Sequence, residues 1–170
     1  MFSRDKTKDR NEEIIEQIIC EKYNNYYRMA YSYVHSEADA SDIVQEGAYK
    51  AIKNSASLRN PEYAGTWIYR IMMNEVYNFL NTKKHISISD EENFIEPEIS
   101  DKYEDVDLKN ALEKMQTKDK AVILLKYFED KKLEEIAEIL NENLSTVKSR
   151  LYRGLKKLKI ELGSEEYGGV

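Results

Sequence analysis

Apolar residues recur at steps of three and four positions through most of this 170-residue chain, and that spacing predicts an all-α fold. The chain contains only six glycines and two prolines, which argues against a loop-rich or all-β protein. We expect frayed residues before Asn11 and a disordered tail after Leu162. The helices predicted from the pattern span about residues 11–34, 36–54, 63–81 (or 66–81), 107–115, 117–129, 133–140 and 144–162.

The helical periodicity stops between Ile86 and Val106, where many acidic residues are opposed by a single cation, Lys102. Charge repulsion and Pro97 predict a flexible acidic linker over residues 85–106. The chain would then form two small helical domains, residues 11–84 and 107–162. A metal site is the alternative explanation for so many carboxylates, but flexible acids lack the fixed geometry that a cation requires.

The pattern of a helix-turn-helix occupies residues 133–159. Ala137 is small, as the first helix requires where the second crosses it closely. Asn141 stands at the reversal of the chain, and asparagine tolerates the left-handed conformation that this turn needs. Asn143 can cap the second helix, and Val147 falls where that helix should press against the first. The second domain is therefore predicted to be a four-helix domain with a helix-turn-helix.

The second helix of this motif has two different sides. An apolar stripe comprises Leu144, Val147, Leu151, Leu155, Leu158 and Leu162. The other side has hydroxyls near the helix start and cations along its length, which suits a helix inserted N-terminus first into a DNA major groove. A surface helix with a solvated basic face is the alternative, but the turn chemistry favours DNA binding. The predicted contacts with duplex DNA are Ser145, Thr146, Lys148, Ser149, Arg150 and Arg153.

The formal net charge of −6 is unusual for a protein that binds DNA. The cations are concentrated between residues 142 and 159, where Glu142 is the only acid. Counterion release from a few local cations can support contact with DNA, but a chain that is acidic as a whole should bind DNA weakly by itself. We therefore expect a partner that supplies most of the affinity.

Several classes of protein are disfavoured by composition. A single cysteine, Cys20, excludes an internal disulfide framework and fits a reducing compartment; because it follows Ile18 and Ile19, we expect it to be buried. The apolar runs are too short to span a bilayer and the N-terminus is too polar for a signal peptide, so we expect a cytoplasmic protein. His35 and His85 are isolated, and no nucleophile–base pair or metal-ligand spacing occurs. We expect no catalytic residues, no metal and no cofactor.

Two further segments, in the first half of the chain, have distinctive patterns: ADASDIVQEGAYKA at 38–51 and TWIYRIMMN at 66–74. The first resembles the D-x-V-Q-E helix, and the second the W-L-Y-R-I-x-x-N helix, of the extracytoplasmic-function (ECF) group of bacterial sigma-70 factors. LEEIAEIL and TVKSRLYRGLKKL in the second half resemble the helix-turn-helix of the same family. The resemblance covers about residues 20–84 and 107–160. It implies an RNA polymerase sigma factor, which directs core polymerase to particular promoters and leaves the reaction to the polymerase.

The resemblance also implies a role for each half. Asp42, Gln45 and Glu46 would contact the clamp helices of the largest polymerase subunit, although a solvated polar face is the alternative. The first domain would recognise the melted −10 element, where single-stranded bases are splayed onto the protein and cations meet the backbone. Its implied −10 contacts are the loop at 55–63 together with Arg70, Asn74, Tyr77, Asn78, Lys83 and Lys84.

The second domain would recognise the duplex −35 element through the six residues named above, with Asn141 in place of the glycine common in the family. The family further implies an anti-sigma factor, membrane-bound for many members, that wraps the two domains. A free-standing helix-turn-helix regulator would explain residues 133–159 equally well, but it leaves the polar face around Asp42 and the helix at 67–74 unexplained. A nuclease with a carboxylate site would need ordered acids on a helix face, whereas the densest run of acids here is in the predicted linker.

Overall fold

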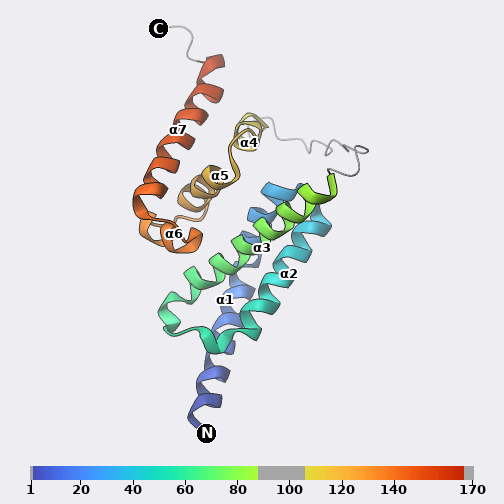
Figure 1. Cartoon of the computed structure of the whole chain (residues 1–170), viewed down its shortest axis with the longest axis vertical. Coiled ribbons are helices and arrows are strands. Elements are labelled where there is room, and N and C mark those ends of the chain that lie inside the picture. Colours follow the sequence, from blue (N-terminus) through green and yellow to red (C-terminus); the bar gives the residue numbers. More distant parts are fainter. Residues whose placement is uncertain (1, 88–105, 167–170) are drawn as a thin grey trace. The chain divides into compact units, whose positions relative to one another are not determined.

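The computed structural model describes residues 2–87 and 106–166, and every regular element within these ranges is helical. The predicted all-α class is therefore confirmed. The chain separates into two compact units, Met1–Ile95 and Glu96–Val170, which are coloured along the sequence in Figure 1. Most of the predicted linker, including its flexibility and the alternative metal site, lies outside the described residues. Among the described residues, no helix is both long enough and apolar enough to cross a membrane.

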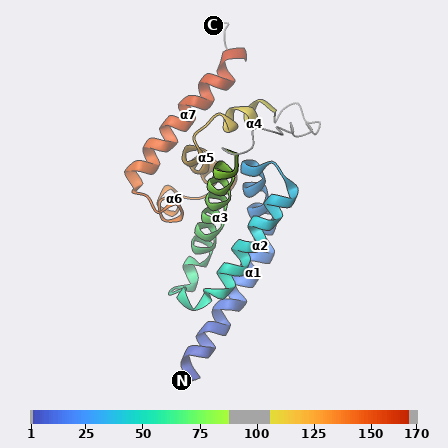
Figure 2. The ribbon, with the colours of Figure 1, turned by 45° about the vertical axis from the view of Figure 1, so that its right-hand side comes forward.

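The first unit is built from three helices, α1 (Phe2–Val34), α2 (Glu37–Lys53) and α3 (Ala64–Ser87). They run alongside one another in both views (Figures 1 and 2). Two short 3-10 helices, η1 (Ser55–Ser57) and η2 (Pro61–Tyr63), lie in the connection from α2 to α3.

The core of the first unit lies where the three helices meet. The ring of Tyr26 on α1 packs edge-on against that of Tyr69 on α3, with the ring centroids 4.9 Å apart. Gly47 lies inside α2, where glycine costs helix stability, and a Cβ at this position would overlap the sulfur of Met72 on α3. Glycine therefore allows α2 and α3 to approach closely. Other buried core residues are Ile15, Ala30, Ala40, Val44, Ala51, Ile68 and Val76.

Two of the predictions for the first unit are wrong. The pattern predicts frayed residues before Asn11, but α1 begins at Phe2, because no glycine or proline interrupts this segment and Lys8 pairs with Glu12 one turn later, at 3.6 Å. Cys20 is exposed rather than buried. The buried side of α1 includes Ile19, and the next residue of a helix points about 100° away from it, which places the thiol towards solvent.

The second unit contains α4 (Val106–Glu113), α5 (Thr117–Ile123), α6 (Leu133–Leu140) and α7 (Leu144–Glu166). A π-helical turn, η3 (Leu124–Phe128), continues α5. This confirms the predicted four-helix domain. The helix α7 runs to Glu166, so the prediction of a disordered tail directly after its last leucine is wrong; Gly163 does not break it.

The turn of the helix-turn-helix has the predicted geometry. Asn141 adopts the left-handed conformation, with φ 53° and ψ 48°. Its backbone N–H donates to the carbonyl of Glu138 at 3.2 Å, and the N–H of Glu142 donates to the carbonyl of Ala137 at 2.9 Å. These bonds satisfy carbonyl groups that the end of α6 would leave unpaired. Val147 of α7 is fully buried, as its predicted place against the first helix requires.

The apolar stripe predicted for α7 is partly wrong. Leu155 is exposed, whereas its neighbour Gly154 is buried. A Cβ at Gly154 would lie 3.0 Å from Cγ1 of Ile123, so the close approach of α5 and α7 is centred on this glycine. A helix turns once per 3.6 residues, so leucines spaced four residues apart move gradually around the helix, away from the side that contacts α5. Leu162 is accordingly exposed as well.

Candidate nucleic-acid interface

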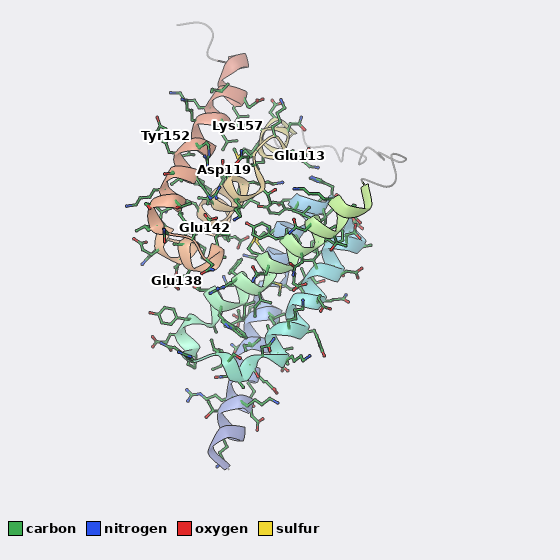
Figure 3. All side chains as sticks on the ribbon, viewed as in Figure 1. Glu113, Asp119, Glu138, Glu142, Tyr152 and Lys157 are labelled. Atoms are coloured by element: carbon green, nitrogen blue, oxygen red, sulfur yellow. The ribbon has the colours of Figure 1, made fainter. Side chains whose placement is uncertain are left out.

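The first half of α7 presents polar side chains on the side that faces away from α5. Ser145, Lys148 and Ser149 are exposed, and Thr146 is half-buried. Tyr152 is 72% exposed and lies on the outer side of α7 in Figure 3. Sequence reasoning missed Tyr152 as a member of this face; its position one helical turn after Lys148 is the signal that could have identified it.

The two arginines of the predicted DNA contacts are engaged within the unit. The Nε and Nη2 groups of Arg150 donate to Glu142 at 2.7 and 3.1 Å, and its Nη1 donates to Oδ1 of Asp119 at 3.1 Å. The Nε and Nη2 groups of Arg153 donate to the two carboxylate oxygens of Asp119 at 2.7 and 3.1 Å. Lys118 also pairs with Glu142, at 3.2 Å. We call these five residues the α5–α7 ion network.

The two arginines differ in how much of the side chain remains accessible. The side chain of Arg150 is 17% exposed and that of Arg153 is 56% exposed. Asp119, which binds both, lies between α5 and α7 in Figure 3. The structure therefore places Arg153 at the edge of the outer face and Arg150 between the helices, although the sequence pattern groups them together.

The arginines fix the ionisation of the two carboxylates. Burial on its own raises the pKa of Asp119, but the hydrogen bonds from Arg153 and Arg150 outweigh it and hold that pKa below its ordinary value. Hydrogen bonds from Arg150 and then Lys118 lower the pKa of Glu142 despite its partial burial. The network of three cations and two anions thus contributes a net charge of +1 to this side of the unit near neutral pH.

On α3, Arg70, Asn74 and Asn78 are exposed and follow one another at steps of four, so they share one face of the helix. Tyr77 borders this face and is half-buried, and Lys84 is exposed further along. Arginine, lysine and asparagine side chains can hydrogen-bond to base edges or phosphates. Most of the predicted −10 residues are therefore on a single accessible surface.

Lys83 is placed differently from the other predicted −10 residues. Its ammonium lies 3.8 Å from a carboxylate oxygen of Asp39 on α2 and 5.5 Å from the centroid of the Phe79 ring. A second ion pair has the lysine on α2 and the acid on α3, where Lys50 pairs with Glu75. Both lysines link α2 to α3, so Lys83 already has partners within the unit.

The loop at 55–63 is anchored at one end and accessible at the other. Ser55 and Leu58 are buried, whereas Arg59, Asn60 and Tyr63 are exposed. Such an arrangement holds the loop on the helices and leaves a cation, an amide and an aromatic ring accessible beside the start of α3. These are the side-chain types that bind unpaired nucleotides.

The third accessible face is on α2. Asp42, Gln45 and Glu46 are all exposed, and Gln45 donates to the hydroxyl of Ser41 at 3.1 Å. Tyr49 extends the same face and is exposed, but sequence reasoning did not include it. Its spacing of three and four residues from the acidic and amide side chains is the signal that places it there.

Comparison with known proteins identifies the family. Residues 21–86 match the family Sigma-70 region 2, and residues 105–158 match Sigma-70, region 4. The chain is 41% identical over 163 residues to the RNA polymerase sigma factor SigV of Bacillus subtilis (strain 168), covering 95% of this chain and 98% of SigV. It is 30% identical to the ECF RNA polymerase sigma factor SigW of the same organism, covering 80% of this chain and 82% of SigW. The chain belongs to the ECF group of the sigma-70 family.

The fold of this sigma factor agrees with that assignment. It resembles the sigma factor RpoE from Bartonella quintana, solved in complex with the anti-sigma factor NepR, with a TM-score of 0.76 and 23% identity. The similarity covers 88% of this chain and 97% of RpoE. The family resemblance inferred from the four sequence segments is confirmed, and with it the function of an RNA polymerase sigma factor that directs transcription to specific promoters.

Proposed function

We propose that this sigma factor uses the three accessible faces for three separate contacts. The face of α2 binds core polymerase, the face of α3 with the loop at 55–63 binds the melted −10 element, and the outer face of α7 binds the duplex −35 element. The observation that supports this division is that the faces lie on two compact units matched in order by region 2 and region 4. The domains that act are residues 11–84 and 107–162. Core polymerase supplies the chemistry, so the sigma factor works with it in the cytoplasm and is not itself an enzyme.

For the −35 element, Ser145 and Thr146 near the start of α7 reach base edges, and Lys148 and Ser149 extend the contact along the groove. Arg153 retains accessible surface while Asp119 orients it, and an oriented guanidinium can pair with guanine, worth about 1–3 kcal/mol of discrimination. Arg150 contributes through Glu142 and Asp119 by holding α7 in place. Tyr152 adds an aromatic surface beside Lys148.

For the −10 element, Asn74 and Asn78 offer amides to base edges, while Arg70 and Lys84 meet the phosphates of the strand. Tyr77 supports this face, and Trp67 and Tyr69 support the helix from its half-buried and buried sides. Lys83 contributes least to strand binding, because Asp39 and the ring of Phe79 already engage its ammonium.

The polymerase contact is tested by reversing one charge on α2. Asp42→Arg should reduce copurification of the full chain with core polymerase, because the acidic face loses its charge complementarity to the partner. Glu13→Arg is the matched control: it reverses an exposed acid on α1, outside the proposed face, and should leave copurification unchanged. Equal recovery of polymerase by wild type and Asp42→Arg would remove α2 from the proposed interface.

The two DNA contacts are tested with reconstituted holoenzyme and a promoter selected from a randomised pool. Run-off transcription should fall for Lys148→Ala and for Arg70→Ala, and binding to polymerase should persist in both. A free-standing helix-turn-helix regulator would behave differently: the purified chain alone would bind intact duplex tightly and selectively, and charge reversal at Asp42 would have no effect on its activity.

An anti-sigma factor is the regulator that we propose for this chain. RpoE of Bartonella quintana, which shares the fold, was solved bound to one. A membrane-anchored anti-sigma factor that covers both units would block the polymerase and promoter faces together. Its addition should abolish run-off transcription by free sigma factor and should compete with core polymerase in copurification; transcription that persists would refute the proposal.

A further inference from the structure

A buried amide on α1 holds the loop that we assign to the −10 element. Asn11 is only 2% exposed. Its Nδ2 group donates to the carbonyl oxygen of Ser55 at 2.9 Å and to that of Leu58 at 3.0 Å. These contacts join positions 44 and 47 residues apart in the sequence. Asn11 lies before residue 21, where the match to region 2 begins, so the family match does not point to it.

The two carbonyls mark the two ends of one turn. The N–H of Leu58 donates to the carbonyl of Ser55 at 3.1 Å, which closes η1, and Asn11 bridges both ends of this turn from the outside. The hydroxyl of Ser55 also lies 3.5 Å from a carboxylate oxygen of Glu12. The helix α1 thus holds the buried half of the loop through two consecutive residues, Asn11 and Glu12.

A side chain needed only to fill space at this position would be apolar, because burying an amide removes hydrogen bonds to water. The amide of Asn11 instead satisfies two backbone carbonyls, and this sets the direction in which the chain leaves Leu58. Arg59 and Asn60 follow directly and are exposed. Asn60 in turn accepts from the N–H of Glu62 at 3.1 Å, so the accessible half of the loop starts from a fixed point.

We infer that Asn11 is a positioning residue for recognition of the −10 element: it holds the loop at 55–63 in the shape that receives an unpaired base. The inference rests on the proposed −10 role of this loop and of α3. A loop that is already ordered loses less conformational entropy when it captures a nucleotide. Without the amide, the loop must become ordered during binding, which lowers affinity. Its selectivity among bases should fall as well, because selectivity depends on a loop shape that is no longer fixed.

The test uses Asn11→Asp, which keeps the size of the side chain but places a carboxylate against two carbonyl oxygens. Reconstituted holoenzyme is titrated with a promoter fragment whose −10 non-template strand is unpaired, carrying either the element selected by wild type or one altered base. Asn11→Asp should weaken binding of the selected element about tenfold, the loss expected for one to two hydrogen bonds. It should also bring the ratio of the affinities for the selected and altered elements close to one. Binding to core polymerase should be unchanged.

Gln17→Glu is the matched control. It makes the same change from amide to carboxylate on the same helix, but Gln17 is exposed and donates to Glu21 one turn away, at 3.1 Å. This variant should keep both the affinity and the base preference. Asn11→Ala, which removes the amide without adding a charge, gives a second measurement of the preference if Asn11→Asp fails to fold.

A merely structural role for Asn11 would lower the melting temperature and leave the preference between the two elements intact, and that result would overturn the inference. Arg70→Ala and Asn74→Ala separate the inference from the proposal on which it rests. If both weaken binding of the unpaired strand and the Asn11 variants do not, the inference alone is wrong. If neither weakens it, the proposed −10 face and the inference fall together.

Discussion

Arg150→Ala should destabilise the second unit more than it should disturb direct contact with DNA. The Arg150 side chain is 17% exposed and donates three hydrogen bonds to two carboxylates. Its removal leaves Glu142 with Lys118 and leaves the almost fully buried Asp119 with Arg153. Both anions then lose a cation that compensates for their lost hydration.

The size of the effect follows from the exposure of the network. Breaking a fully buried ion pair costs about 3–5 kcal/mol, whereas an exposed pair contributes about 0–1 kcal/mol. The α5–α7 ion network lies between these limits, because Arg153 is 56% exposed and each carboxylate keeps one partner. We therefore expect a loss of about 2 kcal/mol, equivalent to a fall of roughly 8–16 °C in melting temperature for a unit of this size.

The assay compares Arg150→Ala with Lys148→Ala in the full chain. Thermal unfolding gives the melting temperature, and hydrogen exchange of the α5 and α7 amides locates the loss in the second unit. Lys148 is exposed, so its replacement should change stability by less than about 0.5 kcal/mol while weakening −35 binding by holoenzyme. Equal melting temperatures for the two variants would refute the assignment of Arg150 to the support of α7. A double-mutant cycle with Glu142→Gln should give a coupling of about 1 kcal/mol.

Three further predictions concern stability. Burial lowers the pKa of Lys120 to about 8. The wild type should therefore gain stability in urea unfolding from about pH 8 to 10, where the unfolded chain binds the extra proton, and Lys120→Met should lack this gain. The pKa values of Asp119 and Glu142 are lowered. The contribution of these two carboxylates to the free energy of unfolding should be complete above about pH 4.5 and should disappear as the pH falls through the lowered pKa values. This loss of stability in acid should be smaller in Arg150→Ala. Gly47→Ala should lower the melting temperature, although alanine has the better helix propensity. The added methyl group would overlap with Met72, and overpacking of this kind costs about 1–3 kcal/mol of stability.

The turn at Asn141 could be predicted from sequence because its cause is local. A left-handed residue at the end of a helix needs glycine or asparagine, and the flanking apolar positions fix where that residue falls. The helix start predicted near residue 36 also has a local cause, because the hydroxyl of Ser36 accepts from the N–H of Asp39 at 3.3 Å at the start of α2. Features of this kind depend on a few neighbouring residues, so they can be predicted from the local sequence.

The roles of Arg150 and Asn11 could not be predicted in this way. Arg150 is bound by Asp119, 31 residues away, and Asn11 binds carbonyls 44 and 47 residues away. Periodicity shows which side of a helix is polar, but it does not show which side chain of another helix meets it. Gly154 illustrates the same limit, since the close contact at this buried position of α7 is formed by Ile123 on α5.

The ion network also explains how an acidic sigma factor can depend on polymerase for tight promoter binding. Asp119 and Glu142 already neutralise much of the charge of Arg150 and Arg153, and Lys157 of α7 donates to the backbone carbonyl of Lys114. The exposed lysines of α7 that remain are Lys148, Lys156 and Lys159. Three or four phosphate contacts release few counterions, so the logarithm of the binding constant would fall with the logarithm of the salt concentration with a slope of only about 3. Affinity of that kind suits a subunit whose promoter contacts become strong only when core polymerase brings both units to one DNA molecule, because the second contact is then intramolecular.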